Sequence, residues 1–158
     1  MLAEKENTKK RFYDFLARKN LRLTSQRRVI VDTVFATEQH FTAAQLLQWS
    51  RARDKSVSKA TVYRTLPLLT ESGLVREMDF GKDYRFYDPN CADRPNHSHI
   101  ICQDCNKIFE FESEEIEQLE DEVARKMGFS IQTRRLEITA RCEVLRRFGS
   151  CKNMPPEK

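Results

Sequence analysis

The sequence contains no apolar run of about 18 residues, the minimum that a membrane-spanning helix needs. Its first residues are charged and hold no apolar core, so a secretory signal is not expected. No internal repeat is visible. These absences argue against membrane-spanning, secreted and repeat proteins. They predict a cytoplasmic chain whose 158 residues form one domain or two small ones.

Histidine is also scarce, with 3 residues in the chain, which holds 5 cysteines as well. A disulfide framework is not expected in a cytoplasmic protein, so the spacing of the cysteines matters more than their number. All three histidines, and three of the five cysteines, lie in or near patterns that are typical of metal ligands.

Charge is unevenly divided along the chain, although the net value is only +4. Residues 1–88 hold 17 Lys and Arg against 11 Asp and Glu, a net charge of +6. Residues 89–158 hold 11 against 13, a net charge of −2. A basic N-terminal half suits a polyanion such as DNA. A solvated basic surface would have the same composition, so charge alone does not decide.

Apolar periodicity and capping residues predict four helices in the basic half, at about residues 8–19, 25–36, 43–53 and 59–72. Two alternating segments, 74–79 and 84–87, predict strands that are joined by a turn. Helices followed by such a hairpin are typical of a winged helix-turn-helix. Pro67 falls inside the fourth helix, where its missing amide predicts a kink or a short break.

The second half alternates between strand and helix patterns. Strands are predicted at 99–102, 107–111 and 130–139, with a helix at 113–127. The polar segment 88–96 holds two prolines and indicates a hinge. The predicted fold class is therefore α+β, with a winged helix at 1–87, a hinge at 88–96 and a metal-binding α/β domain at 97–158.

The fourth helix presents a hydroxyl, a phenol and a cation outside its apolar stripe. Such side chains contact base edges and phosphates in DNA complexes, and nearby cations neutralise the DNA backbone. An ordinary amphipathic helix with a polar exterior is the alternative, and the order of helices followed by a hairpin favours DNA. The candidate DNA-binding residues are Arg22, Arg27, Lys59, Thr61, Tyr63 and Arg64.

Cys102 and Cys105 form a C-x-x-C on a turn between two predicted strands, which suits half of a tetrahedral zinc site. Cys142 and Cys151 are the candidates for the other two ligands. One alternative is a pair of free buried thiols. Another is a thiol oxidoreductase, but a redox C-x-x-C usually opens a helix in a βαβ unit, and that context is lacking.

His97 and His99 stand two residues apart, on the same face of a predicted strand. Two imidazoles in this arrangement chelate a divalent metal. Further candidate ligands are His40, Asp88 and Glu110. Mixed nitrogen and oxygen donors suit Fe(II), Mn(II), Zn(II), Co(II) or Ni(II) without choosing among them.

Together these segments resemble the ferric uptake regulator superfamily over nearly the whole chain. The resemblance is carried by Arg22-x-Thr24-x-x-Arg27, His40-Phe41-Thr42-Ala43, Thr61-Val62-Tyr63-Arg64-x-Leu66, Gly73-Leu74-Val75, His97-x-His99-Ile100-Ile101-Cys102-x-x-Cys105, Glu110-Phe111, Ile116-Glu117 and Leu136-Glu137-Ile138-x-x-x-Cys142.

The resemblance implies a homodimer, joined through the strands of the C-terminal domain, that represses genes when metal is bound. It implies structural zinc on two C-x-x-C pairs and DNA contacts at Tyr63 and Arg64. It also implies a regulatory Fe2+, Mn2+ or Zn2+ at the hinge, held by His40, His97, His99, Glu110 and an acidic residue at or near Asp88.

The chain departs from this family pattern at several positions. Leu145 stands where the second C-x-x-C would end, so either Cys151 replaces that ligand or the zinc site is incomplete. Tyr87 separates the aromatic end of the wing from Asp88. Ser98 and Arg134 replace donors of the accessory metal site that many members have, so that site is not expected. The peroxide-sensing branch typically has Asp where this chain has Glu110, which favours control of metal uptake over peroxide sensing.

Overall fold

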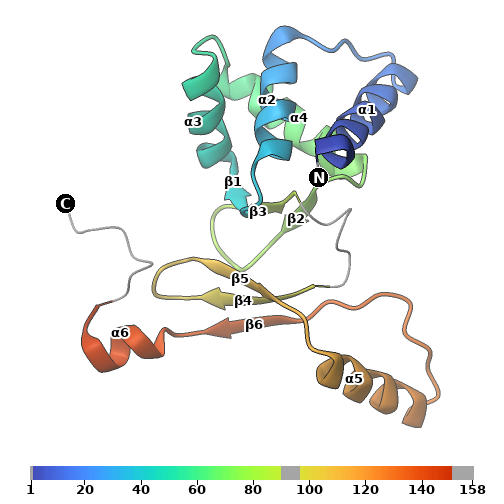
Figure 1. The fold of residues 1–158 in the computed structure, drawn as a ribbon, viewed down its shortest axis with the longest axis vertical. Helices are drawn as coiled ribbons and strands as arrows, with labels where there is room; N and C mark the ends of the chain where they lie inside the picture. Colours follow the sequence, from blue (N-terminus) through green and yellow to red (C-terminus); the bar gives the residue numbers. More distant parts are fainter. Residues whose placement is uncertain (1, 90–96, 151–158) are drawn as a thin grey trace. The chain divides into compact units, whose positions relative to one another are not determined.

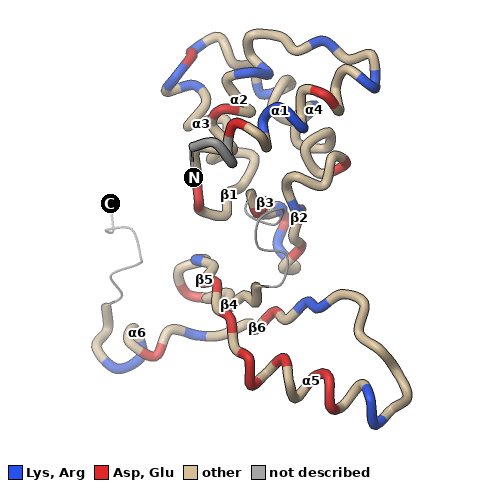
Figure 2. The backbone as a smooth tube through the Cα atoms, turned by 45° about the vertical axis from the view of Figure 1, so that its right-hand side comes forward, with Lys and Arg blue, Asp and Glu red and all other residues tan. Residues whose placement is uncertain are grey.

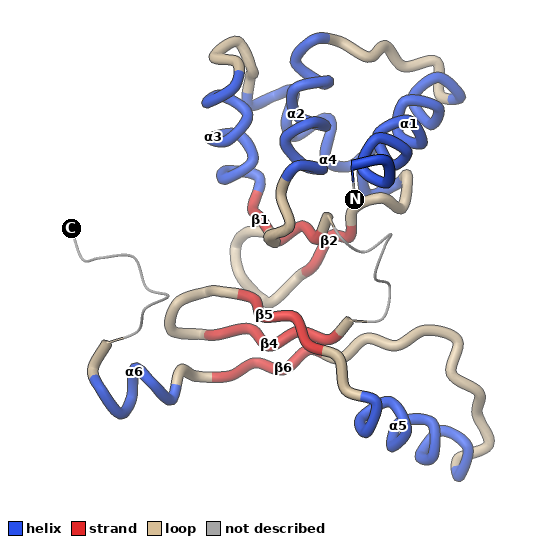
Figure 3. Tube along the Cα trace, in the orientation of Figure 1, coloured by secondary structure: helices blue, strands red, loops and turns tan. Residues whose placement is uncertain are grey.

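The computed structural model describes residues 2–89 and 97–150. The chain divides into two compact units, here called the N-terminal unit (Met1–Pro95) and the C-terminal unit (Asn96–Lys158). Figures 1 and 3 show helices gathered in the first unit and a sheet with two flanking helices in the second. The α+β class is confirmed.

Four helices build the N-terminal unit: α1 (Leu2–Arg18), α2 (Ser25–Ala36), α3 (Ala43–Arg53) and α4 (Lys59–Glu71). A hydroxyl residue caps the last three: Thr24, Thr42 and Ser58 each accept a bond from the backbone amide three residues further on. Such caps satisfy amides that the first helical turn leaves without a partner. Local sequence therefore determines where these helices begin.

A small antiparallel sheet closes the unit, with the strand order β1-β3-β2. Its strands are β1 (Phe41–Thr42), β2 (Arg76–Met78) and β3 (Phe86–Asp88). The predicted hairpin is confirmed, and with the helices it forms a winged helix. Strand β1 was not predicted, because two residues are too few to show alternation. Asp88, predicted to begin the hinge, is the last residue of β3.

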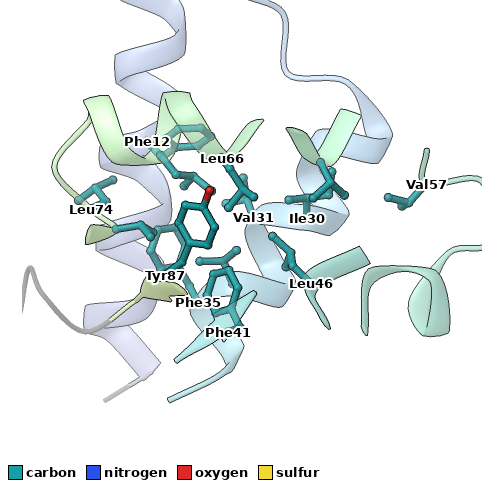
Figure 4. Close-up of a cluster of buried hydrophobic side chains, with 14 of the residues drawn as sticks. Phe12, Ile30, Val31, Phe35, Phe41, Leu46, Val57, Leu66, Leu74 and Tyr87 are labelled. Carbon is teal, nitrogen blue, oxygen red and sulfur yellow. The ribbon is translucent and has the colours of Figure 1, made fainter. Parts of the chain in front are cut away.

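Buried side chains from all four helices and from the sheet form one apolar cluster (Figure 4). Its members include Phe12 from α1, Ile30 and Val31 from α2, Leu46 from α3 and Leu66 from α4. Phe41 of β1 and Tyr87 of β3 join it, with their rings stacked at a centroid distance of 5.8 Å. The cluster therefore fixes both the helix carrying the candidate DNA contacts and the strands carrying candidate metal ligands.

The C-terminal unit contains β4 (Ser98–Cys102), β5 (Ile108–Phe111), α5 (Glu114–Lys126), β6 (Glu137–Ala140) and α6 (Glu143–Phe148). The strand order is β5-β4-β6. Strand β4 pairs antiparallel with β5 and parallel with β6. The turn from β4 to β5 holds the C-x-x-C.

Two expectations about elements were wrong. Helix α1 starts at Leu2 instead of residue 8, because the residues before Thr8 are mostly good helix formers. Of the kink or short break predicted at Pro67, the break is absent, because helix α4 continues through the proline with Leu66 and Leu69 buried on either side. The strand predicted at 130–139 is only Glu137–Ala140, because β4 offers just four residues to pair with.

Within the described residues, no helix is long and apolar enough to cross a membrane.

Candidate metal and DNA-binding sites

In the N-terminal unit, His40 and Asp88 lie side by side at the end of the β1–β3 ladder. Phe41 pairs with Tyr87, so the antiparallel register brings the residue before Phe41 opposite the residue after Tyr87. The Nε2 atom of His40 is 3.9 Å from Oδ1 of Asp88, and both side chains are buried. The strand pairing therefore builds one imidazole–carboxylate pair.

In the C-terminal unit, β4 and β5 bring together His97, His99 and Glu110. The two imidazole rings have centroids 4.6 Å apart, and Nε2 of His97 is 3.8 Å from Oε1 of Glu110. His99 pairs directly with Glu110 across the ladder. Both histidines are buried. This group holds two imidazoles and one carboxylate.

These donors fit a divalent metal. Ligand atoms that share one metal at about 2.0–2.2 Å stand about 3–4 Å apart, and the two measured imidazole–carboxylate distances are 3.9 and 3.8 Å. Imidazole and carboxylate together suit first-row transition metals. Each unit therefore carries an incomplete donor set of its own, one with two donors and the other with three.

Sequence reasoning missed Glu137, which pairs with His99 from the other side. Its Oε1 accepts a bond of 2.7 Å from Nε of Arg135. His99 therefore stands between two carboxylate-bearing residues, Glu110 on β5 and Glu137 on β6. The parallel β4–β6 pairing that creates this arrangement has no local sequence signal.

The three cysteines that the structure describes in the C-terminal unit, Cys102, Cys105 and Cys142, are not joined by a disulfide. Backbone contacts place the C-x-x-C turn beside the start of α6. The amide of Gln103 donates to the carbonyl of Ala140 at 2.8 Å, and the amide of Cys142 donates to Asp104 Oδ2 at 2.6 Å. Cys151, the fourth predicted zinc ligand, lies outside the described residues.

Cys142 caps α6, and its sulfur accepts the amide of Leu145 at 3.4 Å. Leu145 therefore holds the Cys142 sulfur through its backbone amide, although its side chain offers no ligand at the position where the family pattern has a cysteine.

Helix α4 exposes three of the six predicted DNA contacts, namely Lys59, Tyr63 and Arg64. The side chain of Tyr63 is 52% exposed to solvent. The ammonium of Lys59 lies 5.6 Å from the centre of the Tyr63 ring, a cation–π contact. Cation and phenol are thus presented together on one surface.

The other predicted contacts differ from one another. The guanidinium of Arg27 donates to the backbone carbonyl of the exposed Arg22, and burial lowers the pKa of Arg27. The hydroxyl of Thr61 donates to Oε1 of Gln26 at 2.9 Å and lies 2.8 Å from Oγ of Ser58. Gln26 was not singled out from the sequence, because a contact across 35 residues leaves no local pattern.

Positive charge gathers at one end of the N-terminal unit, around the α1–α2 and α3–α4 connections (Figure 2). Arg22 belongs to the α1–α2 connection, and Arg27 and Lys59 lie in the first turns of α2 and α4. Helix α5 of the C-terminal unit is mainly acidic, with Glu114, Glu115 and Glu117 in its first turn. The charge division predicted from the sequence thus becomes a localised basic surface on one unit.

A winged helix with basic residues gathered at one end, in a chain whose sheet unit carries candidate metal ligands, defines a metal-dependent transcription regulator. The chain belongs to the ferric uptake regulator family, whose model matches residues 18–139. The resemblance noted in the sequence is confirmed.

Curated relatives agree with this assignment. The chain is 34% identical over 145 residues to the ferric uptake regulation protein of Campylobacter jejuni, covering 90% of this chain and 87% of the relative. It is 38% identical over 135 residues to that of Brucella abortus, covering 85% and 94%. A peroxide-responsive repressor of Staphylococcus epidermidis is 28% identical and covers 85% of this chain and 88% of its own.

Solved structures share the fold. The Helicobacter pylori ferric uptake regulator, described as having three functional metal binding sites, is 26% identical with a TM-score of 0.83, covering 92% of this chain and 96% of its own. A zinc uptake regulator complexed with zinc and DNA is 25% identical with a TM-score of 0.51, covering 91% and 98%.

Proposed function

We propose that this chain is a DNA-binding repressor that controls genes of metal uptake or homeostasis and binds its operator when a divalent metal is present. The observation that carries the proposal is the division of the donors: His40 and Asp88 belong to the DNA-binding unit, and His97, His99 and Glu110 belong to the other unit. Its action is binding without a catalytic step, and its place of action is the cytoplasm.

All five donors would hold one Fe2+, Mn2+ or Zn2+ ion. The ion supplies positive charge that favours deprotonated carboxylates and neutral imidazoles gathered around one point. His40 and Asp88 tie the wing and β1 to that point, while His97, His99 and Glu110 tie the C-terminal sheet to it. Metal binding therefore selects one orientation of the winged helix, and operator affinity rises because only that orientation fits.

DNA is bound through the basic end of the N-terminal unit. Lys59, Tyr63 and Arg64 are exposed on the first two turns of α4 and would reach base edges and phosphates in the major groove. Arg22 would contact the phosphate backbone. Arg27 and Thr61, whose side chains bond within the protein, would support these contacts from inside the unit.

The acting species is a homodimer. Helix α5 has no buried residue, and one side of it exposes Leu119 (61%), Val123, Met127 (68%) and the following Phe129 (69%). These side chains line a hollow of about 460 Å³. Large apolar side chains exposed together on one side of a helix are typical of an interface, and a second copy of the unit fits because a two-fold dimer buries the same surface on both partners.

Structural zinc would be held by Cys102, Cys105 and Cys142, with Cys151 as the fourth ligand. Support comes from the backbone bonds that bring the C-x-x-C turn to the start of α6, and from the amide that donates to the Cys142 sulfur. Four thiolates on one zinc would tie β4 to the C-terminal end of the unit.

The test measures the affinity of the metal-loaded protein for duplex DNA that it has itself selected from a random pool. Fluorescence anisotropy compares Mn(II), Zn(II) and chelator. We expect binding to be about 5- to 150-fold tighter with metal than with chelator. The variant His97→Ala/His99→Ala is expected to bind equally weakly under all conditions.

Ser98→Ala is the matched control, because Ser98 lies between the two histidines on β4. It should keep the metal dependence of the parent. Retained metal dependence in the double histidine variant would contradict the metal site. A parent protein that selects no duplex under any condition would contradict the DNA-binding function.

A further inference from the structure

One side chain of α2 holds the first turn of the recognition helix α4. The Oε1 atom of Gln26 accepts two bonds at once, from the backbone amide of Ser58 at 3.1 Å and from the hydroxyl of Thr61 at 2.9 Å. These residues are 32 and 35 positions away in the sequence. Gln26 itself lies in the first turn of α2 and is half-buried.

Both donors belong to the capping structure of α4. Ser58 is the N-cap, and its Oγ accepts the amide of Thr61 at 3.1 Å. The hydroxyls of Ser58 and Thr61 also contact each other at 2.8 Å. Gln26 therefore bonds to the cap residue and to the third residue of the helix, which makes one closed network of three side chains.

The remainder of the α2–α4 packing is apolar, with Ile30 and Val31 in the same cluster as Val62 and Leu66. Apolar contact stabilises but has no preferred direction, whereas hydrogen bonds weaken steeply when their geometry changes. The bonds to Gln26 thus determine the position of α4 along its own axis and its rotation relative to α2. This position and rotation decide where Lys59, Tyr63 and Arg64 lie, because these residues belong to the first two turns of α4.

We infer that Gln26 is a positioning residue for sequence-specific DNA binding, and that Thr61 acts through Gln26 rather than as an independent DNA contact. The inference rests on the proposed DNA-binding function. It is distinct from the metal site, because none of the three side chains is a proposed ligand.

The test is a double-mutant cycle with Gln26→Met and Thr61→Val. Methionine keeps the length of the side chain without the acceptor oxygen, and valine keeps the shape of threonine without the hydroxyl. Each single variant is expected to bind the selected duplex about 5- to 10-fold more weakly, as the loss of a net hydrogen bond predicts. The double variant should bind no more weakly than the weaker single variant, because both changes open the same network.

Two further readouts separate positioning from general loss of stability. Affinity for an unrelated duplex should change less than about twofold, since phosphate contacts are independent of sequence, and Mn(II) affinity should equal that of the parent. The control is Gln45→Met, which removes another glutamine acceptor, the one that caps Thr42 at the start of α3. It should leave the ratio of selected to unrelated duplex affinity unchanged.

Losses that add in the double variant would overturn the inference, because Thr61 would then contact DNA by itself. Unchanged affinity in Gln26→Met would also overturn it. Failure of the parent protein to select any duplex is a different result, since it removes the proposed function and the inference with it.

Discussion

The two units of this chain are stabilised in different ways. In the N-terminal unit, every helix and the sheet contribute to one buried cluster, which includes Phe12, Ile30, Leu46 and Leu66. In the described part of the C-terminal unit, the only buried apolar side chains are Ile101 and Cys102, both on β4. Helices α5 and α6 contain no buried residue.

This difference shows which unit a single chain can stabilise by itself and which unit needs a second copy of the chain or a metal. The N-terminal unit has a core of its own, so we expect it to fold without metal or a partner. The C-terminal unit exposes the apolar side of α5 and carries cysteines and histidines in ligand arrangements. Its stability should therefore depend on a second copy and on metal, which is how a regulator can respond to both.

The largest expected effect comes from the core of the N-terminal unit. Phe12 is fully buried and stacks on Phe15 at a centroid distance of 6.1 Å. Phe12→Ala should lower the free energy of unfolding of this unit by about 3–5 kcal/mol, through lost burial and the cavity left behind. Urea unfolding followed by circular dichroism measures it, with exposed Phe148→Ala as the control. A loss that depends on protein concentration would contradict an independently stable unit.

A somewhat smaller effect is expected on assembly from the apolar side of α5. Val123→Asp places a charge on the surface that a second copy would cover, so the dissociation constant of the dimer should rise about 30-fold or more. Sedimentation velocity over a range of concentrations measures it. Glu122→Gln on the same helix, whose carboxylate pairs with Lys126 at 2.6 Å, should leave the dimer intact. A dimer that survives Val123→Asp would show that α5 is not the interface.

The smallest effect concerns the pH dependence of the N-terminal unit. Burial and the facing Glu77 raise the pKa of Tyr87 to about 12, from an ordinary value of 10.0. The folded protein thus holds this proton more tightly than the unfolded chain does. The resulting stabilisation is fully present below pH 10 and is lost as the pH rises through about 12.

In the parent protein, the free energy of unfolding should fall between pH 10 and 12 as Tyr87 loses its proton in the unfolded chain. Tyr87→Phe should make this fall less steep, as measured by urea unfolding at several pH values. The same measurement at pH 7 is the control, because the phenol is protonated there in both states. Equal slopes for parent and variant would show that Tyr87 does not titrate differently on folding.

The elements that the sequence predicted well are those with local signals. The caps at Thr24, Thr42 and Ser58 mark where three helices begin, since each cap bonds only three residues ahead. The strand predicted at 130–139 failed, because alternation shows which residues suit a strand but not whether a partner strand lies opposite. At Pro67 the helix continues without a break, and the buried Leu66 and Leu69 hold it on both sides of this local defect.

For the candidate sites, residue types and spacing were enough to propose His40, Asp88, His97, His99 and Glu110 as ligands of a regulatory metal. They also led to Cys102, Cys105, Cys142 and Cys151 as candidate zinc ligands. Sequence could not show that Arg27 and Thr61 bond inside the protein, that Gln26 accepts the hydroxyl of Thr61, or that Glu137 pairs with His99. Those relations depend on contacts between segments that are far apart in the chain.

The sequence by itself determined the winged-helix order, the family and the candidate ligand residues, because capping, periodicity and short ligand spacings act within a few residues. Only the tertiary structure decided which candidate ligands each unit brings together and which polar side chains form hydrogen bonds inside the protein. It also decided that the apolar side chains of α5 are exposed to solvent. These outcomes follow from strand register and from packing between distant segments, and neither leaves a trace in any local stretch of the chain.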